Sequence, residues 1–489
     1  MENKNIQRSN IQPETEKKEK FFSISEFRRE VGIPLIVAKK LIIWGEIKAG
    51  KAMDGTIMIA ESETLKVKEL LKNPRKKIKL FFRSLGPGLI TGASDDDPSG
   101  IGTYSAVGAK FGLSILWTAA WLLPIMFAVQ EVCARIGIVT NKGLTKVLLK
   151  HYRKKVVLVI VLLLIIANII NIGADLGAMA ASLKMVANIN FYFGLIFFSL
   201  VIVLTEVFLG YHIYVKVLKW LTISVFAYII TGIIVHPNWL HIFKEAFVPY
   251  IEFSEEYIFA VIAVFGTSIT PYLFFWQTSE EVEEERMQNP WMKKCSICDR
   301  ISRMRTDVGF GMILANIVFF FIILTTAEVL FKNGITNIES AEQAALALKP
   351  LGGRFAFLLF AIGIIGTGLL AVPVLAGSGA YALSELLNWK EGLELKFSKA
   401  KGFYLIIIFS VIVGMLLNLL GINPIMALYY AAFINGIIAL PLLIAIMIAG
   451  NDPKIMGKET HPLWVKFFGW FSIVSISVLI IISGFLYFV

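Results

Sequence analysis

Long apolar runs alternate with short polar segments along most of the chain, from Leu85 onward. Each run is about twenty residues long, which is the length of α-helix that crosses a ~30 Å hydrocarbon layer. The runs lack the short alternating pattern of an outer-membrane β-barrel, so helices are the spanning structure that satisfies the backbone in lipid. The pattern predicts an all-α integral membrane protein with eleven transmembrane helices, at about residues 85–108, 113–137, 156–183, 191–209, 217–235, 257–276, 308–331, 354–384, 403–420, 424–449 and 467–488.

Composition and charge agree with this prediction. Hydrophobic residues make up 56% of the 489 residues, and the mean hydropathy of +0.71 lies well above that of soluble domains. Basic clusters within 142–155 and 286–305 fall on one side of the predicted topology, and only scattered cations fall on the other. The positive-inside rule therefore predicts a cytoplasmic N-terminus, an outside C-terminus and a location in the cell membrane. The net charge of +11 is mostly a property of this topology rather than a sign of nucleic-acid affinity.

The polar N-terminal part of the chain divides into two segments before the membrane domain. Residues 1–20 are charged and polar, which predicts a disordered tail. Residues 21–82 carry local structure signals and are predicted to form a small cytosolic domain. Residues 83–489 hold all the predicted spans and form the transmembrane domain.

The N-terminal domain has the signals of a helix, a turn, a second helix and a hairpin. Ser25 can cap a short helix, a second helix ends near Gly45, and Asp54-Gly55 lies between two extended runs as a hairpin turn. This order resembles the small winged helix-turn-helix modules of excisionase-type DNA-binding proteins. Two alternatives follow for the domain: binding of nucleic acid, or a compact cytosolic cap that is regulatory or structural.

Two of the apolar runs are interrupted by proline near their middle. The first run contains DDDPSG, with Pro98 after three aspartates, and the sixth contains GTSITPY, with Pro271. Proline lacks a backbone N–H and clashes with the preceding turn, so both helices should unwind there. The two runs are five apart, and paired breaks in two five-helix halves point to an inverted-repeat transporter with its substrate at the midplane.

Carboxylates inside the first break favour a cation as the substrate. Neighbouring residues on a helix point about 100° apart, so Asp95, Asp96 and Asp97 do not all face one site. Asp97 adjoins the break and is the best candidate ligand, and the other two line the pathway, cap a helix end or pair with a cation. A carboxylate at the bilayer centre is costly unless it faces water or a partner, so a cationic substrate is expected.

The same residues carry a resemblance to a known family. Gly86–Gly100, GPGLITGASDDDPSG, resembles the first span of the Nramp divalent metal transporters, which carries G-P-G and then D-P-G-N. Gln130–Leu144 and Asn171–Leu183 are similar to that family's second and third spans, and Thr270–Tyr272 falls where the family has M-P-H. The resemblance covers about residues 83–450. It implies the 5+5 inverted-repeat fold of the amino-acid and neurotransmitter transporters with broken helices 1 and 6, and divalent metal ions as transported substrates without enzymatic activity or a cofactor.

The resemblance implies metal ligands at four positions. Typical members bind the metal through the Asp and Asn of D-P-G-N, a backbone carbonyl of the sixth span and the Met of M-P-H; the matching residues here are Asp97, Gly100, Thr267 and Thr270. Thr270 replaces the methionine, which removes the thioether that favours manganese or iron over magnesium. A roomy, oxygen-lined site suits hydrated Mg²⁺, because magnesium dehydrates reluctantly.

The proton relay of the family is also altered. Tyr272 stands where the family has histidine, and Asn168 and Ala178 stand where acidic residues flank the retained Asp175. We therefore expect uncoupled uptake of Mg²⁺, with Mn²⁺ also passing, as in the Nramp-related magnesium transporter branch. The alternative is a proton-coupled Mn²⁺/Fe²⁺ transporter of the usual Nramp type.

Other polar residues in the spans are candidates for the pathway or the surroundings of the site. They are Asp96, Asp175, Tyr272, Gln277 and Asn435. The amide of Asn435 has two open roles, an oxygen near the site or a hydrogen bond to a neighbouring helix.

Two other functional classes are weighed against transport. An intramembrane enzyme is disfavoured because no histidine lies near the aspartates and no phosphate-cradling glycine loop is present. A membrane-tethered sensor using the N-terminal domain remains an alternative, although eleven spans are far more than an anchor requires. The pair Cys295 and Cys298 is a candidate metal or redox motif, against the simpler interpretation of two reduced thiols.

Overall fold

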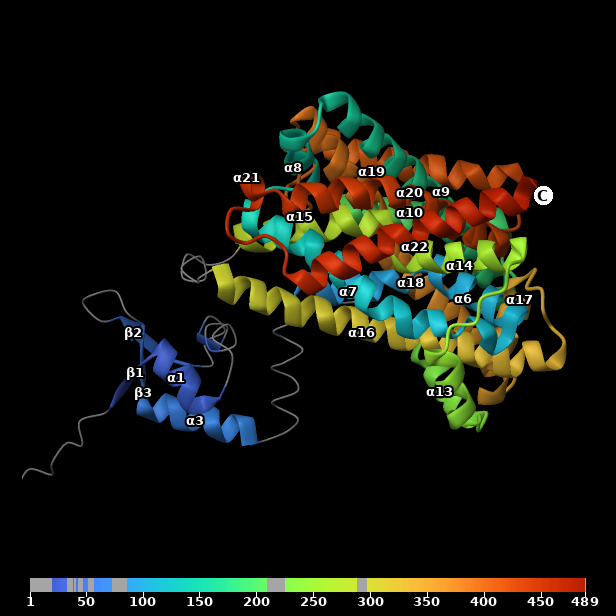
Figure 1. Cartoon of the computed structure of the whole chain (residues 1–489), viewed down its shortest axis with the longest axis horizontal. Helices are drawn as coiled ribbons and strands as arrows, with labels where there is room; N and C mark the ends of the chain where they lie inside the picture. The colour runs from blue at the N-terminus through green and yellow to red at the C-terminus, as the bar shows by residue number, and fades with distance from the viewer. Residues whose placement is uncertain are drawn as a thin grey trace, which may run out of the picture. The chain divides into compact units, whose positions relative to one another are not determined.

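The computed structural model describes residues 20–32, 38, 41–42, 47–51, 57–72, 86–208, 225–287 and 297–488. The chain divides into two compact units, Met1–Leu85 and Gly86–Val489. Figure 1 draws the first unit in blue and the second from cyan to red. Each unit is described by itself below.

The first unit is a small three-stranded antiparallel sheet with helices packed on it. The strands lie in the order β1-β3-β2, and the apolar residues Phe27, Ala38, Leu41, Ile47, Ile59 and Val67 form its core. The elements are β1 (Phe21–Ser23), α1 (Ile24–Val31), β2 (Ala49–Lys51), β3 (Ile57–Ala60) and α3 (Glu61–Lys72).

The first helix of this unit is present, but the predicted cap at Ser25 is wrong. Ser23 is the cap, because it ends β1 in an extended conformation and Glu26 follows three residues later. The Ser23 hydroxyl accepts a hydrogen bond from the Glu26 N–H at 3.3 Å, and the Glu26 carboxylate accepts one from the Ser23 N–H at 2.8 Å. This reciprocal capping box satisfies two donors at the helix start, whereas Ser25 lies inside α1.

The pairing of β2 with β3 brackets the predicted hairpin turn. Lys51 faces Ile57 in an antiparallel register. The turn itself, Asp54-Gly55, lies outside the described residues, as do the predicted helix end at Gly45 and residues 1–19 of the predicted tail. Nucleic-acid binding by this unit stays a prediction.

The second unit is a bundle of long helices, many of which run side by side in Figure 1. Helices and short 3₁₀ segments occupy α5 (Pro87–Asp95), α6 (Pro98–Phe111), η1 (Gly112–Ile115), α7 (Trp117–Thr140), α8 (Leu144–His151), α9 (Lys154–Ala187), α10 (Phe191–Phe208), α12 (Ala227–Ile234), α13 (Trp239–Phe247), α14 (Glu255–Ser268), α15 (Pro271–Met287), α16 (Ile297–Val329), η4 (Phe331–Asn333), α17 (Ala341–Ala345), η5 (Leu346–Leu351), α18 (Arg354–Leu387), α19 (Lys401–Leu417), η6 (Asn418–Leu420), α20 (Pro424–Asn451), α21 (Pro453–Met456) and α22 (Leu463–Phe488).

Nine helices within the described ranges are long and apolar enough to cross a membrane. Two of the eleven predicted spans are not among these nine helices. The first span is present as α5 and α6, each too short to count alone. The predicted span 217–235 falls partly on residues 209–224, which lie outside the described residues, and α12 covers its end. The remaining predicted spans each coincide with one of the nine, and the span at 257–276 covers α14 together with the start of α15, which the count joins as Glu255–Arg286. This supports a multi-pass membrane protein.

The contacts between helices place the two broken helices within the bundle. The first broken helix, α5 with α6, packs on α16, while the second, α14 with α15, packs on α7 and α20. The long helices α9 and α18, which are the third and eighth spans, pack against each other along their length. Helices 1 and 6 therefore lie inside the bundle, as an inverted repeat requires.

Candidate functional site

The first break separates α5 from α6 at Asp96 and Asp97. Asp97 is the N-cap of α6, and its Oδ1 accepts a hydrogen bond from the Gly100 N–H at 2.7 Å. Gly100 therefore contributes a backbone donor that orients the carboxylate. Asp95, Asp96 and Asp97 are all buried, with exposed fractions of 2%, 8% and 1%.

The second break separates α14 from α15 at Ile269 and Thr270. In a continuous helix the Thr267 carbonyl accepts from the N–H four residues later, but that residue is Pro271, which has none. Ser94 and Pro98 stand in the same relation in the first break. Each proline therefore frees one carbonyl oxygen at the break of its helix.

The Tyr272 hydroxyl donates a hydrogen bond to one of these freed carbonyls, that of Ser94. This hydroxyl lies 2.8 Å from the Ser94 oxygen and 3.3 Å from Asp97 Oδ2, so it joins α15 to the first break. No such bond reaches the Thr267 oxygen among the loop and turn hydrogen bonds of the described residues. The two freed carbonyls therefore differ in their hydrogen-bond partners.

Side-chain hydrogen bonds tie the two broken helices together on both sides of the breaks. Between α6 and α14, the hydroxyls of Ser99 and Thr267 lie 3.3 Å apart, and those of Tyr104 and Ser268 lie 2.9 Å apart. Between α5 and α15, Thr91 donates to the Gln277 side chain. The structure therefore places Gln277 in the contact between the two half-helices below the break.

Four half-helix ends meet the breaks. The C-terminal ends of α5 and α14 carry partial negative charge, and the N-terminal ends of α6 and α15 carry partial positive charge. Half-helix C-termini and unwound carbonyls are the groups that coordinate cations in broken-helix transporters. Asp97 adds a carboxylate at the same place.

Several buried side-chain atoms on the helices around the breaks find no hydrogen-bond partner among the described residues. They include Ser94 Oγ, Asp95 Oδ1 and both carboxylate oxygens of Asp175 on α9. An unmet buried polar group costs about 1–3 kcal/mol, so a cation with bound water would relieve this cost. In the described part of the chain no three His, Cys, Asp or Glu side chains form a ready metal cage, so such a cation would also use carbonyl, hydroxyl and water oxygens.

Asn435 hydrogen-bonds a neighbouring helix. Its amide exchanges two hydrogen bonds with that of Asn171, at 2.8 Å and 3.0 Å, which joins α20 to α9. Of the two roles that the sequence left open, this is the one that the structure describes.

Asp307 is a residue of the surroundings that the sequence did not single out. From α16 its carboxylate accepts hydrogen bonds from the N–H groups of Gly86 and Gly88, at 2.8 Å and 2.7 Å, at the N-terminus of α5. Gly88 also lies against the backbone of Val308, where a side chain would collide. The α5 half-helix is therefore held to α16 at its far end from the break.

We expect Asp307→Ala to loosen α5. The substitution leaves two helix N–H groups without an acceptor, which costs about 1–3 kcal/mol each when buried. The measurement is the thermal midpoint of the purified protein, together with labelling of Thr91→Cys by a thiol reagent. Asp307→Ala should lower the midpoint and speed the labelling at position 91. Asp307→Asn keeps one acceptor and should show a smaller change in both. An unchanged labelling rate in Asp307→Ala would contradict the cap.

Some of these features leave a sequence signal and others do not. The freed carbonyl of Ser94 follows from its position four residues before Pro98. Nothing local marks Tyr104 or Asp307, because their partners Ser268 and Gly86 lie far away in the chain.

Comparison with known proteins gives a consistent family. Residues 88–486 match the model of the family Nramp, described as natural resistance-associated macrophage protein-like. Two curated relatives, both named divalent metal cation transporter MntH and both from Klebsiella pneumoniae, are similar to the chain. One is 25% identical over 411 residues, covering 82% of this chain and 93% of the relative. The other is 23% identical over 419 residues, covering 84% and 94%.

Solved structures show the same fold at low identity. A manganese transporter from Eremococcus coleocola aligns with a TM-score of 0.67 and 17% identity, covering 84% of this chain and 88% of that one. Mhp1, a nucleobase-cation-symport-1 family transporter, aligns with a TM-score of 0.53 and 12% identity, covering 82% and 92%. These similarities confirm the predicted transporter fold with its broken first and sixth helices.

The family match spans all of the described membrane helices except the first residue of α5 and the end of α22. The chain therefore belongs to the Nramp family of divalent metal cation transporters, and it is a multi-pass membrane transporter rather than an enzyme.

Proposed function

We propose that this transporter mediates uncoupled uptake of hydrated Mg²⁺, with Mn²⁺ as a second substrate. The proposed site lies between the two breaks. Asp97 supplies a carboxylate oxygen, Thr267 its carbonyl and Thr270 its hydroxyl, while Gly100 holds Asp97 and leaves room for water. The divalent metal transport named for the Klebsiella relatives and the manganese named for the Eremococcus structure support a divalent cation here.

The observation that carries the choice of magnesium is the residue at position 270. Thr270 is fully buried beside the break and presents a hydroxyl group there. Hard oxygen donors with retained water suit Mg²⁺, whereas a thioether at this point would favour softer transition metals.

Neutral groups around α9 support transport without proton coupling. Asn168 donates hydrogen bonds of 2.8 Å to the Leu375 carbonyl and the Ser378 hydroxyl, so it acts as a link to α18. The Tyr272 hydroxyl donates a hydrogen bond to its acceptors, and a phenol keeps its proton at neutral pH. Of the relay positions considered in the sequence, Asp175 alone keeps a carboxylate.

The basic clusters also bear on the location and orientation of the protein. We place it in the cell membrane with the N-terminus in the cytoplasm, because the basic clusters fall on that side of the predicted topology. The first unit then lies in the cytosol, where a role in regulation or in binding nucleic acid stays a prediction.

Reconstitution into liposomes tests the ion and the coupling together. With a magnesium dye and a pH dye inside, Mg²⁺ added under an imposed membrane potential should enter without internal acidification. Empty liposomes give the leak, and reversing the potential should suppress the entry of Mg²⁺. Entry of Mn²⁺ with acidification, and no Mg²⁺ signal, would overturn the proposal in favour of a proton-coupled transition-metal carrier.

A further inference from the structure

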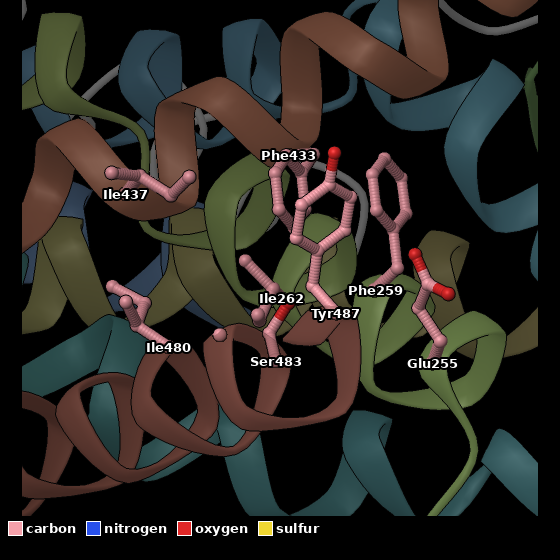
Figure 2. Close-up of a pocket in the computed structure, with 9 residues that line it drawn as sticks. Glu255, Phe259, Ile262, Phe433, Ile437, Ile480, Ser483 and Tyr487 are labelled. Carbon is pink, nitrogen blue, oxygen red and sulfur yellow. The ribbon is translucent and has the colours of Figure 1, made fainter. Parts of the chain in front are cut away.

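A groove of about 440 Å³ opens where α14, α20 and α22 meet. Its walls are the apolar side chains Phe259, Phe433, Ile437, Ile480 and Tyr487, and Glu255 lies at one end. Figure 2 shows the rings of Phe259, Phe433 and Tyr487 close together, with the Glu255 carboxylate beside Phe259. The volume lies within the range of about 300–1,000 Å³ typical of ligand sites.

The groove faces the hydrocarbon of the membrane. The neighbouring side chains of Ile481 and Phe485 on α22 are 70% and 66% exposed, and α22 is one of the helices able to span the membrane. Exposed apolar residues on a spanning helix are in contact with lipid. The molecules available to fill the groove are therefore those of the bilayer.

The shape of the groove follows from the packing of α14 on α20. Near the break the two backbones touch, because Gly266 lies against Ala432 and Gly436, where a side chain would collide. Towards Glu255 the helices are held by the rings of Phe259 and Phe433, which stack with centroids 3.9 Å apart. A side chain added at Gly484 would meet no atom within 4 Å, so the space beside α22 is open.

The charged side chain at the end of the groove is negative and lies in the first turn of α14. Glu256 pairs with Lys110 at 2.9 Å. Within the described ranges its neighbour Glu255 forms no salt bridge, and Glu255 is the one charged residue that lines the groove. A cationic group is therefore the complement of this end, and an anionic one would be repelled.

We propose that the groove binds one acyl chain of a phospholipid with a primary amine headgroup, with its ammonium beside Glu255. The apolar walls fit the chain. An ammonium has three N–H donors for a carboxylate, whereas a quaternary choline group has none. Phosphatidylethanolamine has this headgroup and, unlike phosphatidylserine, carries no carboxylate that Glu255 would repel.

Lipid in this groove is placed to affect transport. The α14 half-helix begins at the groove and ends at Thr267 and Ser268, which face the breaks. A chain between α14, α20 and α22 stabilises the arrangement in which these helices are packed. The inference concerns lipid and holds whichever cation the transporter carries.

Lipid binding to the purified full-length protein tests the proposal without measuring transport. Bound lipid is counted by native mass spectrometry, and the thermal midpoint is recorded, with phosphatidylethanolamine, phosphatidylcholine or phosphatidylglycerol of the same chains added. The wild-type protein should bind the ethanolamine lipid about tenfold more tightly than the others, a difference of about 1.4 kcal/mol. Glu255→Gln should lose this preference, while the matched control Glu252→Gln, exposed on the preceding segment, should keep it.

A second pair of variants tests the groove itself. Gly484→Leu fills the open space and should abolish specific binding of all three lipids, and the smaller Gly484→Ala should weaken it. Equal binding of the ethanolamine lipid to wild type and Gly484→Leu would overturn the site. Equal or tighter binding of the glycerol or choline lipid to the wild type would overturn the role of Glu255.

Discussion

Replacing Asp97 with asparagine is expected to lower divalent metal uptake at least about 100-fold, a loss of about 2.7 kcal/mol of transport-competent binding. The substitution separates two roles of the residue. Asparagine caps a helix as well as aspartate does, so the bond from the Gly100 N–H is retained and α6 still begins at Pro98. The negative charge is lost, and with it the carboxylate on which the proposed cation site depends.

The measurement is initial uptake of Mg²⁺ and Mn²⁺ into liposomes with equal amounts of folded protein, judged by the thermal midpoint. Asp97→Ala serves as the comparison, because it removes the cap and the charge together and should also lower that midpoint. Asp95→Asn is the matched carboxylate control and should keep most of the uptake. Normal uptake in Asp97→Asn would mean that Asp97 acts only as a helix cap and that the ion binds elsewhere.

Replacing Thr270 with methionine is expected to shift selectivity from Mg²⁺ towards Mn²⁺ and Cd²⁺ by about tenfold, or about 1.4 kcal/mol. Thr270 lies between α14 and α15 and is fully buried. A thioether at this position would supply a soft ligand, which transition metals bind better than magnesium does. The added volume also displaces water that hydrated Mg²⁺ would retain.

Thr270→Leu is the control for volume, because leucine has nearly the size of methionine and no sulfur. Competition of Cd²⁺ and Mg²⁺ against Mn²⁺ uptake gives the ratio for each variant. Both variants should transport Mg²⁺ more slowly, and Thr270→Met alone should gain Cd²⁺. The same Cd²⁺ ratio in both variants would show that the side chain at position 270 does not contact the ion.

Local backbone chemistry predicts part of the structure at the two breaks. Pro98 and Pro271 determine where α5 and α14 end, and each removes the donor of a carbonyl four residues earlier. The fate of these two carbonyls differs, however. The Ser94 oxygen accepts a hydrogen bond from the Tyr272 hydroxyl at 2.8 Å. No loop or turn hydrogen bond of the described residues reaches the Thr267 oxygen. Only the packing of α15 against the first break makes this difference.

Helix boundaries were predicted well where hydrophobicity changes abruptly along the chain. The predicted span at 424–449 corresponds to α20, Pro424–Asn451, and that at 354–384 to α18, Arg354–Leu387. The predicted span at 308–331 began too late, because α16 continues as a polar helix from Ile297. This polar turn carries Arg303, which pairs with Glu284 of α15. Tertiary ion pairing extends the helix beyond what a hydrophobic window detects.

The sequence by itself determined the membrane class, the paired proline breaks and the candidate role of Asp97, because these depend on composition, period and local backbone chemistry. Only the tertiary structure decided which partners the polar groups have. Asn435 joins Asn171, Gln277 joins Thr91, and Asp307 caps α5. Such pairs join residues that are distant in the chain, so no local pattern encodes them. Their geometry is set by the packing of whole helices, which is a property of the folded bundle.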